Sequence, residues 1–275
     1  MSRNKILPVV LLSLLIIFLL SFMTCLIIFP NNYYFRFNGK AEELYNEVYE
    51  TDDVDSLNVD MISADIDVRY SEDEKIRVII NGYEKVKDTY RINLNNRELS
   101  ITENSKPTFW FGFSSGGDNI IIYLPQSYKN DISLKGVSSD IRLRNDYDLD
   151  LTVKTTSGDV NINRINNINV ETTSGEINIK SAKKVKASSV SGDIDINNLT
   201  NLDVKTVSGD VSLGIIKMTK NGKIKTTSGD VRIDEVKNVY VETKTTSGDV
   251  DINKNDRKAD IILSITTVSG DITVG

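Results

Sequence analysis

The sequence predicts an all-β fold, a parallel β-solenoid with two main strands per coil, preceded by one N-terminal transmembrane helix. Three observations lead to this prediction. A Ser-Gly-acid phrase returns seven times in the second half of the chain, at Ser157, Ser174, Ser191, Ser208, Ser228, Ser247 and Ser269. Apolar and polar residues alternate on both sides of each phrase, as they do in half-buried strands. The period of about 17–22 residues per coil is typical of a solenoid, and the segment 1–30 differs from the rest in composition.

The N-terminal segment is expected to anchor the chain in the cell membrane as a single-pass protein. Residues 6–29 carry no charge over 24 positions, which at about 1.5 Å per residue is enough to cross a hydrocarbon core of about 30 Å. Arg3 and Lys5 precede this run, so the positive-inside tendency places residues 1–5 in the cytoplasm and the C-terminal domain outside. A cleaved signal peptide is the alternative, but the run is long and no small-x-small site follows it. A lipid-modified Cys25 fits less well, because the residues around it are bulky or apolar.

Between the membrane and the regular repeat, the sequence predicts two further parts. Residues 30–56 are expected to be a linker, with modest helical character from Lys40 to Glu50. Residues 57–150 are expected to be an N-terminal β region that caps the solenoid, with variant copies of the repeat at Ser63 and Ser138 and strands at 75–81, 89–94, 98–102 and 119–124. An aromatic stretch at 109–117 is expected to be a long loop that either packs in the cap or contacts a ligand or membrane.

Residues 151–275 are expected to form the regular coils, and a glycine at each corner is their structural signature. If the repeat serine is numbered zero, the inward-facing positions are the even ones up to and including the serine and the odd ones after the glycine. This change from even to odd requires the chain to turn at the glycine. A glycine can take a positive φ at such a turn or let stacked backbones approach closely. A hydroxyl residue two positions before each serine is expected to pack inward at the corner. The corner glycines are Gly158, Gly175, Gly192, Gly209, Gly229, Gly248 and Gly270.

Composition excludes several kinds of chemistry. The chain has no histidine, and its one cysteine, Cys25, lies in the apolar N-terminal run. Ser-His and Cys-His nucleophilic pairs, intrachain disulfides and Cys/His zinc sites outside the membrane segment are therefore excluded. Residues 31–275 carry 31 basic and 39 acidic side chains, so nucleic acid is not an expected partner. No cofactor and no catalytic residue is predicted.

The acid that follows each corner glycine is the strongest candidate for chemistry. Stacked coils would place these carboxylates about 4.8 Å apart, where like charges repel unless something compensates. One interpretation is that each acid accepts hydrogen bonds from N–H groups of the turn. The alternative is a calcium site, for which the candidate ligands are Asp193, Asp195, Asp249 and Asp251.

Two further columns have competing interpretations. Lys154, Lys205, Lys225 and Lys244 form a broken basic stripe, which is either a solvated face or a binding site. An ice- or glycan-binding array would need outward hydroxyls on a flat sheet, and the outward column beside each serine mixes threonine with valine.

These residues resemble a known group. The Ser-Gly-Asp-Val/Ile-x-Ile repeats, the earlier copy at Ser63, Ala64 and Asp65, and the strand at 120–125 are similar to the bacterial "putative adhesin" family of unknown function with β-strand repeats. The resemblance covers about residues 57–275 and implies a membrane-anchored β-solenoid of the cell envelope. That family has no established catalytic residues to carry over.

The expected function is therefore a non-enzymatic, adhesin-like binding or structural module outside the membrane, with a link to envelope stress left open. Its partners would be the membrane through residues 6–29 and a cell-surface glycan or envelope protein. Two alternatives remain: a polysaccharide-acting β-helix enzyme, and a scaffold that self-associates through its C-terminal edge, because the chain stops directly after its last strand.

Overall fold

The computed structural model describes residues 41–104, 118–253 and 255–275. The membrane segment at 6–29, Cys25 and the aromatic loop at 109–117 lie outside the described residues. The regular secondary structure of the described part consists of strands joined into one continuous sheet, apart from two 3-10 turns, Thr51–Asp53 and Glu84–Thr89. No helix in this part of the chain is long and apolar enough to cross a membrane. The strands are β1 Glu42–Glu50, β2 Ser56–Met61, β3 Asp65–Tyr70, β4 Lys75–Gly82, β5 Tyr90–Asn95, β6 Glu98–Glu103, β7 Asn119–Leu124, β8 Ile132–Gly136, β9 Ile141–Asp146, β10 Asp150–Lys154, β11 Val160–Glu171, β12 Ile177–Ser188, β13 Ile194–Lys205, β14 Val211–Ile216, β15 Gly222–Lys225, β16 Val231–Val236, β17 Tyr240–Lys244, β18 Val250–Ile252, β19 Ile262–Thr266 and β20 Ile272–Val274.

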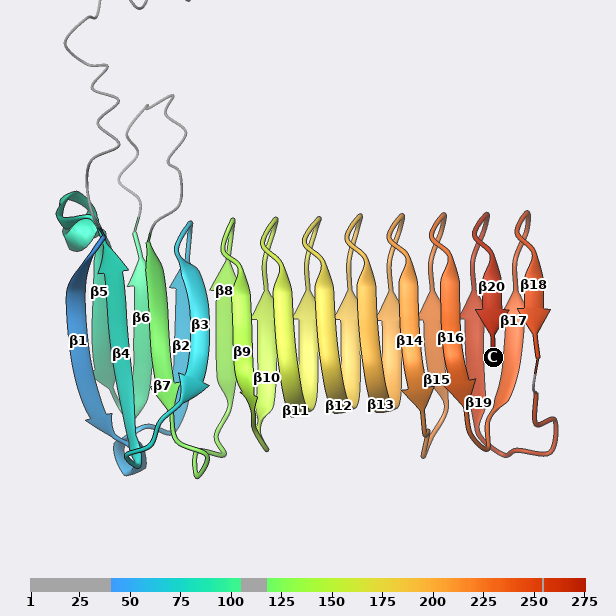
Figure 1. Ribbon diagram of the computed structural model, residues 1–275, viewed down its shortest axis with the longest axis horizontal. Coiled ribbons are helices and arrows are strands. Elements are labelled where there is room, and N and C mark those ends of the chain that lie inside the picture. Colours follow the sequence, from blue (N-terminus) through green and yellow to red (C-terminus); the bar gives the residue numbers. More distant parts are fainter. Residues whose placement is uncertain (1–40, 105–117, 254) are drawn as a thin grey trace, which may run out of the picture. The chain divides into compact units, whose positions relative to one another are not determined.

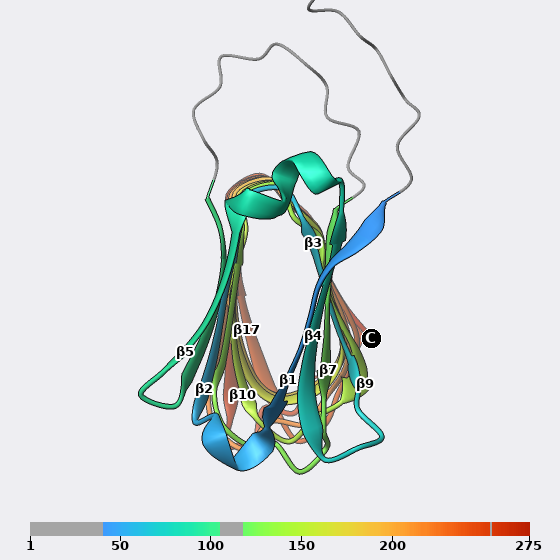
Figure 2. The same ribbon diagram turned by 90° about the vertical axis from the view of Figure 1, so that its left-hand side faces the viewer.

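The sheet winds into a solenoid with two faces. Figure 1 shows its rungs stacked along the long axis, and the end view in Figure 2 shows two strand layers that meet at a corner. Neighbouring coils pair in parallel and in register, so that Val160 lies beside Ile177 and Ile177 beside Ile194. We call the layer that contains β8 and β10 the first face and the layer that contains β9 and β14 the second face. The predicted β-solenoid with two strands per coil is confirmed.

The core lies between the two faces and is built from the alternating apolar columns. Ile162 and Ile179 on the second face are 3% and 1% exposed, and Val153 and Val170 on the first face are fully buried. Each coil has a second bend, near Ile165 and its equivalents, which lies inside the 12-residue strands β11, β12 and β13. At this bend the buried residues are three positions apart instead of two. The chain therefore turns inside the strand while its backbone stays paired with the strands of the adjacent coils.

The corner glycines are required by close approach and not by unusual backbone angles. No glycine in the described part has a positive φ. A Cβ atom on Gly192 would lie 2.0 Å from the carbonyl oxygen of Gly175 in the previous rung, and one on Gly175 would lie 1.9 Å from that of Gly158. Any side chain at these positions would push two stacked turns apart, so the repeat of glycine follows from the rung spacing.

Two coils lie out of sequence order. Near the C-terminus, β19 and β20 are inserted between the β15/β16 rung and the β17/β18 rung, so β20 pairs with β16 on one side and β18 on the other. At the opposite end, β2 and β3 lie between the β6/β7 rung and the β8/β9 rung. The expectation that the last strand of the chain forms a free edge is therefore wrong. Among the described strands, β17 and β18 form the edge at this end of the solenoid.

The first part of the solenoid contains strands where a linker was expected. β1 pairs antiparallel with β4 along its whole length, and Leu44 and Val54 are buried in the core. The helical interpretation of residues 40–50 is wrong because the outer edge of β4 needs a backbone partner, which a strand can provide and a helix cannot. The strands predicted at 75–81, 89–94, 98–102 and 119–124 are confirmed as β4, β5, β6 and β7.

Candidate functional site

The acid column forms a ladder of hydrogen bonds between rungs. The aspartate carboxylates of this column accept a bond from the backbone N–H of the acid in the next rung; for example, Asp210 N–H donates to Asp193 Oδ1 at 2.8 Å. Seven such bonds of 2.8–3.0 Å run along the second face. The hydrogen-bond interpretation of this column is confirmed, with the donor supplied by the neighbouring coil. Each bond gives a negative carboxylate a positively polarised partner and so offsets repulsion within the column.

The hydroxyl column before each corner also has a structural role. Thr155 Oγ1 accepts a hydrogen bond from the N–H of Gly158 at 3.1 Å, and all seven regular corners repeat this contact. These hydroxyl residues are buried except at Thr245, which is partly buried. The serine of the repeat is different from what the parity predicted. Ser157, Ser191 and their equivalents are exposed, because the turn begins one residue before the glycine and rotates the serine outward.

The four candidate calcium ligands lie in two separate places. Asp193 is part of the ladder and Asp195 follows on β13, whereas Asp249 and Asp251 lie at the terminal rung. No group of three or more acids, histidines or cysteines in the described residues is arranged to hold a metal ion. A calcium site at these aspartates stays a prediction.

Ion pairs break up the basic stripe on the first face. Lys154 lies 2.9 Å from Glu171, and Lys205 lies 3.9 Å from Asp203. Hydrogen bonding to Lys154 holds the pKa of the Glu171 carboxyl below its usual value.

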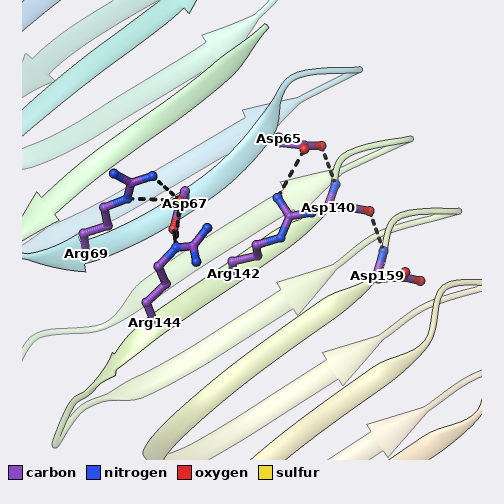
Figure 3. A network of polar contacts seen from close by, with 7 residues as sticks. All are labelled: Asp65, Asp67, Arg69, Asp140, Arg142, Arg144 and Asp159. Carbon is purple, nitrogen blue, oxygen red and sulfur yellow. Dashed lines mark hydrogen bonds and ion pairs between the residues drawn. The ribbon is translucent and has the colours of Figure 1, made fainter. Parts of the chain in front are cut away.

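Arginines and aspartates form a network where the irregular rungs meet the regular ones (Figure 3). Asp67, whose side chain is 7% exposed, accepts bonds from Arg69 on its own strand and from Arg144 Nε on β9 at 2.7 and 2.9 Å. Arg142 bridges Asp65 and Asp140. Burial acts to raise the pKa of Asp67, but hydrogen bonds and charge from Arg144 and Arg69 outweigh it, and the pKa lies below its usual value. Asp67 therefore stays ionised at neutral pH and holds the guanidinium groups of Arg69 and Arg144 in place.

A shallow groove begins at these arginines and runs across the second face. We call it the face groove; its volume is about 460 Å³. Two parallel columns of outward side chains form its walls, and the backbone between them forms its floor, because the side chains of Leu143, Ile162 and Ile179 point into the core. The wall residues are Arg142, Arg144, Asn161, Asn163, Asn178, Lys180, Asp195 and Asn197.

Amide groups dominate this groove. Four rungs at about 4.8 Å give it a length of about 14 Å between the outermost side chains. Each asparagine presents both a donor and an acceptor, and the terminal nitrogens of Arg144 donate no hydrogen bond to an acid in the described part of the chain. Such a surface can hydrogen-bond an extended, hydroxyl-rich ligand. Asp195 is the one carboxylate among the residues that line the groove, whereas hydrolysis of a glycosidic bond normally uses two.

The sequence contains a signal for this groove that the repeat obscured. Four and six residues after the repeat serine, the outward positions of consecutive coils carry arginine and then mainly asparagine. This outward pattern identifies Asn161, Asn163, Asn178 and Asn197 in the sequence. Only the stacked structure shows that the two columns enclose a hollow.

Comparisons with known proteins agree with the fold. A family profile described as Toastrack DUF4097 matches residues 54–275. A solved structure named as a "putative adhesin" from Parabacteroides merdae is 13% identical and has a TM-score of 0.57, with 86% of this chain and 98% of that chain covered. A "putative adhesin" from Parabacteroides distasonis is 12% identical with a TM-score of 0.56 and the same coverage. A "putative lipid binding protein" from that species is 15% identical with a TM-score of 0.52, again covering 86% of this chain and 98% of that chain. No curated protein matches the sequence.

Proposed function

We propose a function from one premise: this chain belongs to the Toastrack DUF4097 family. In this proposal the solenoid is a non-enzymatic binding module that holds a linear, hydroxyl-rich polymer, such as a glycan chain, in the face groove. Residues 6–29 anchor it in the cell membrane, with the solenoid on the outer side. The observation that carries the proposal is the run of outward amides on consecutive rungs, which begins at arginines held in place by buried or half-buried aspartates.

The geometry of the groove favours a polymer over a small molecule. It is open and shallow, and its polar groups lie in lines instead of converging on one point. The rung spacing of about 4.8 Å is similar to the length of one sugar ring, so successive units can meet equivalent amides. Several weak contacts along one chain add up to useful affinity. The names of two structural neighbours, both "putative adhesin", are compatible with such a role.

The binding test uses the full-length chain in detergent and a panel of soluble linear glycan fragments from bacterial cell walls. Asn161→Ala combined with Asn178→Ala removes two wall amides that make no side-chain hydrogen bond within the described residues. We expect at least a tenfold loss of affinity for any fragment that the unmodified chain binds. The matched control is Asn93→Ala with Asn95→Ala, which removes two exposed amides on β5. Equal affinity of all three proteins, or no binding by the unmodified chain, would contradict the proposal.

The anchoring part is tested separately. Protease added to intact cells that make the full-length chain should remove the solenoid, whereas complete protection would place it inside.

A further inference from the structure

A second hollow follows the second bend of the coils. That bend lies along the lower edge of the regular coils in Figure 1. We call it the bend groove; its volume is about 310 Å³, and it shares no lining residue with the face groove. Five successive rungs contribute to it, from β11 to the residue after β16. Its cations are Arg164, Lys183, Lys217 and Lys237.

The floor of the bend groove is apolar. Ile165, Ala182 and Leu199 point inward and are at most 5% exposed, while Ile215 lies outward in the groove with 37% of its surface exposed. The uncharged polar residues along its walls are Asn166, Ser181, Asn198 and Thr200. No acid lines this hollow, in contrast to the face groove, which contains Asp195.

Two of the four cations are already neutralised. Arg164 lies 3.0 Å from Asp146 and 3.9 Å from Asp148, and Lys237 lies 3.1 Å from Glu235. Lys183 and Lys217 make no ion pair in the part of the chain that the structure describes. The bend groove therefore presents two uncompensated positive charges beside an exposed isoleucine.

The surrounding coils strengthen this positive field. Residues 180–237 contain 11 basic and 7 acidic side chains, whereas residues 41–104 contain 7 basic and 17 acidic ones. The excess of positive charge thus lies in the coils that form the groove, although the whole chain is acidic. A local field of this kind attracts anions and accelerates their association.

We infer that the bend groove binds phosphate groups of a linear phosphodiester polymer. Lys183 and Lys217 lie on rungs about 9.6 Å apart, so the two uncompensated charges are spaced along the groove and do not surround one anion. Lysine suits phosphate as a mobile point charge, whereas Arg164, the residue suited to bidentate carboxylate recognition, is occupied by acids of this chain. Ile215 and the apolar floor can contact the carbon units between phosphates.

The test compares two double variants of the full-length chain that have the same net charge. Lys183→Gln with Lys217→Gln removes the two unpaired cations of the bend groove. Lys205→Gln with Lys225→Gln removes two exposed lysines of the first face, which do not line it. The probes are linear polyphosphate, inorganic phosphate, and dihexanoyl phosphatidylglycerol kept below its micelle concentration. Binding is measured by calorimetry over a series of salt concentrations.

We expect polyphosphate to bind the unmodified chain and the Lys205/Lys225 variant, and to bind the Lys183/Lys217 variant at least tenfold more weakly. In the Lys183/Lys217 variant the slope of log affinity against log salt should be shallower by about 1 to 2 units, because two counterion-releasing contacts are lost. If both variants lose the same affinity for polyphosphate, net charge alone explains the effect and the inference is overturned. If no protein binds polyphosphate and only the Lys183/Lys217 variant loses binding of phosphatidylglycerol, the groove binds lipid headgroups. That result would overturn the inference that its ligand is a polymer. These variants leave the face groove intact, so failure here is distinct from failure of the glycan test.

Discussion

The backbone N–H of Glu176 donates a hydrogen bond to Asp159 Oδ1 at 2.9 Å, yet the Glu176 carboxylate accepts none from Asp193 in the following rung. In the described part of the chain, this is the one gap in a ladder that otherwise runs from Asp65 to Asp249. Glutamate is one methylene longer than aspartate, so its carboxylate extends past the N–H that an aspartate reaches. The ladder and its gap indicate how this solenoid can be stabilised.

Glu176→Asp should close the gap and stabilise the solenoid by about 1 kcal/mol, the usual net value of one hydrogen bond. For a domain of this size that is a rise in Tm of about 2–4 °C. Thermal unfolding followed by circular dichroism measures it. The reciprocal control, Asp193→Glu, should lower Tm by a similar amount because it breaks the bond to Asp210. If Glu176→Asp leaves Tm unchanged, the ladder does not stabilise the fold.

Gly192→Ala should destabilise the solenoid by about 3 kcal/mol or more, as expected when an atom is forced into packed backbone. Its Cβ would lie 2.0 Å from the carbonyl oxygen of Gly175, and neither turn can move without shifting its own neighbours. Gly222→Ala is the control, because the atom closest to its added Cβ is the flexible end of Met218. Urea unfolding of both variants should show a large loss for the first and a small change for the second. Similar stabilities would contradict the stacked-corner explanation.

Asp67→Asn should cost about 3 kcal/mol at neutral pH, because it leaves Arg69 and Arg144 without their shared carboxylate. The pKa of Asp67 in the folded protein lies below its ordinary value of 3.8, so its stabilising contribution is present above pH 4 and disappears as the pH falls through the folded pKa. The variant should therefore lose that part of the acid dependence. Stability measured from pH 7 to pH 2 tests both effects.

The control for Asp67 is Asp55→Asn. Asp55 pairs with Arg97, but its side chain is 60% exposed and solvent screens the pair, so the change should have little effect on stability. If the two variants are equally stable at neutral pH, the network around Asp67 makes no special contribution.

Asn255→Ala should increase self-association. The Asn255 side chain accepts a bond from the N–H of Val241 and donates one to its carbonyl, both at 2.9 Å, and so occupies the outer edge of β17 as a neighbouring strand would. Without it, the exposed edge can pair with another molecule. Sedimentation velocity over a concentration series should show a larger dimer fraction than for the unmodified chain or for Asn253→Ala in the same loop. A purely monomeric variant would show that Asn255 does not protect this edge.

The amino-acid sequence by itself determined the coil. Its inward apolar columns, corner glycines and hydroxyl residues recur at a fixed offset. The apolar residues and glycines are explained by contacts with the equivalent residue one rung away, and the hydroxyl residues by a hydrogen bond from the glycine of the same corner. The exposed serine was mispredicted because parity describes a straight strand, and the chain has already begun to turn at that residue.

The tertiary structure alone decided which coils are neighbours and which outward residues act together. The repeat makes every coil compatible with every other, so the sequence could not show that β19 and β20 insert between the β15/β16 rung and the β17/β18 rung. Residues 40–50 have too little periodicity to identify a strand from the sequence. β1 forms because its backbone pairs with the otherwise open edge of β4. The two grooves likewise exist only after stacking, because the side chains that wall them belong to different coils, which are distant along the chain and adjacent in space.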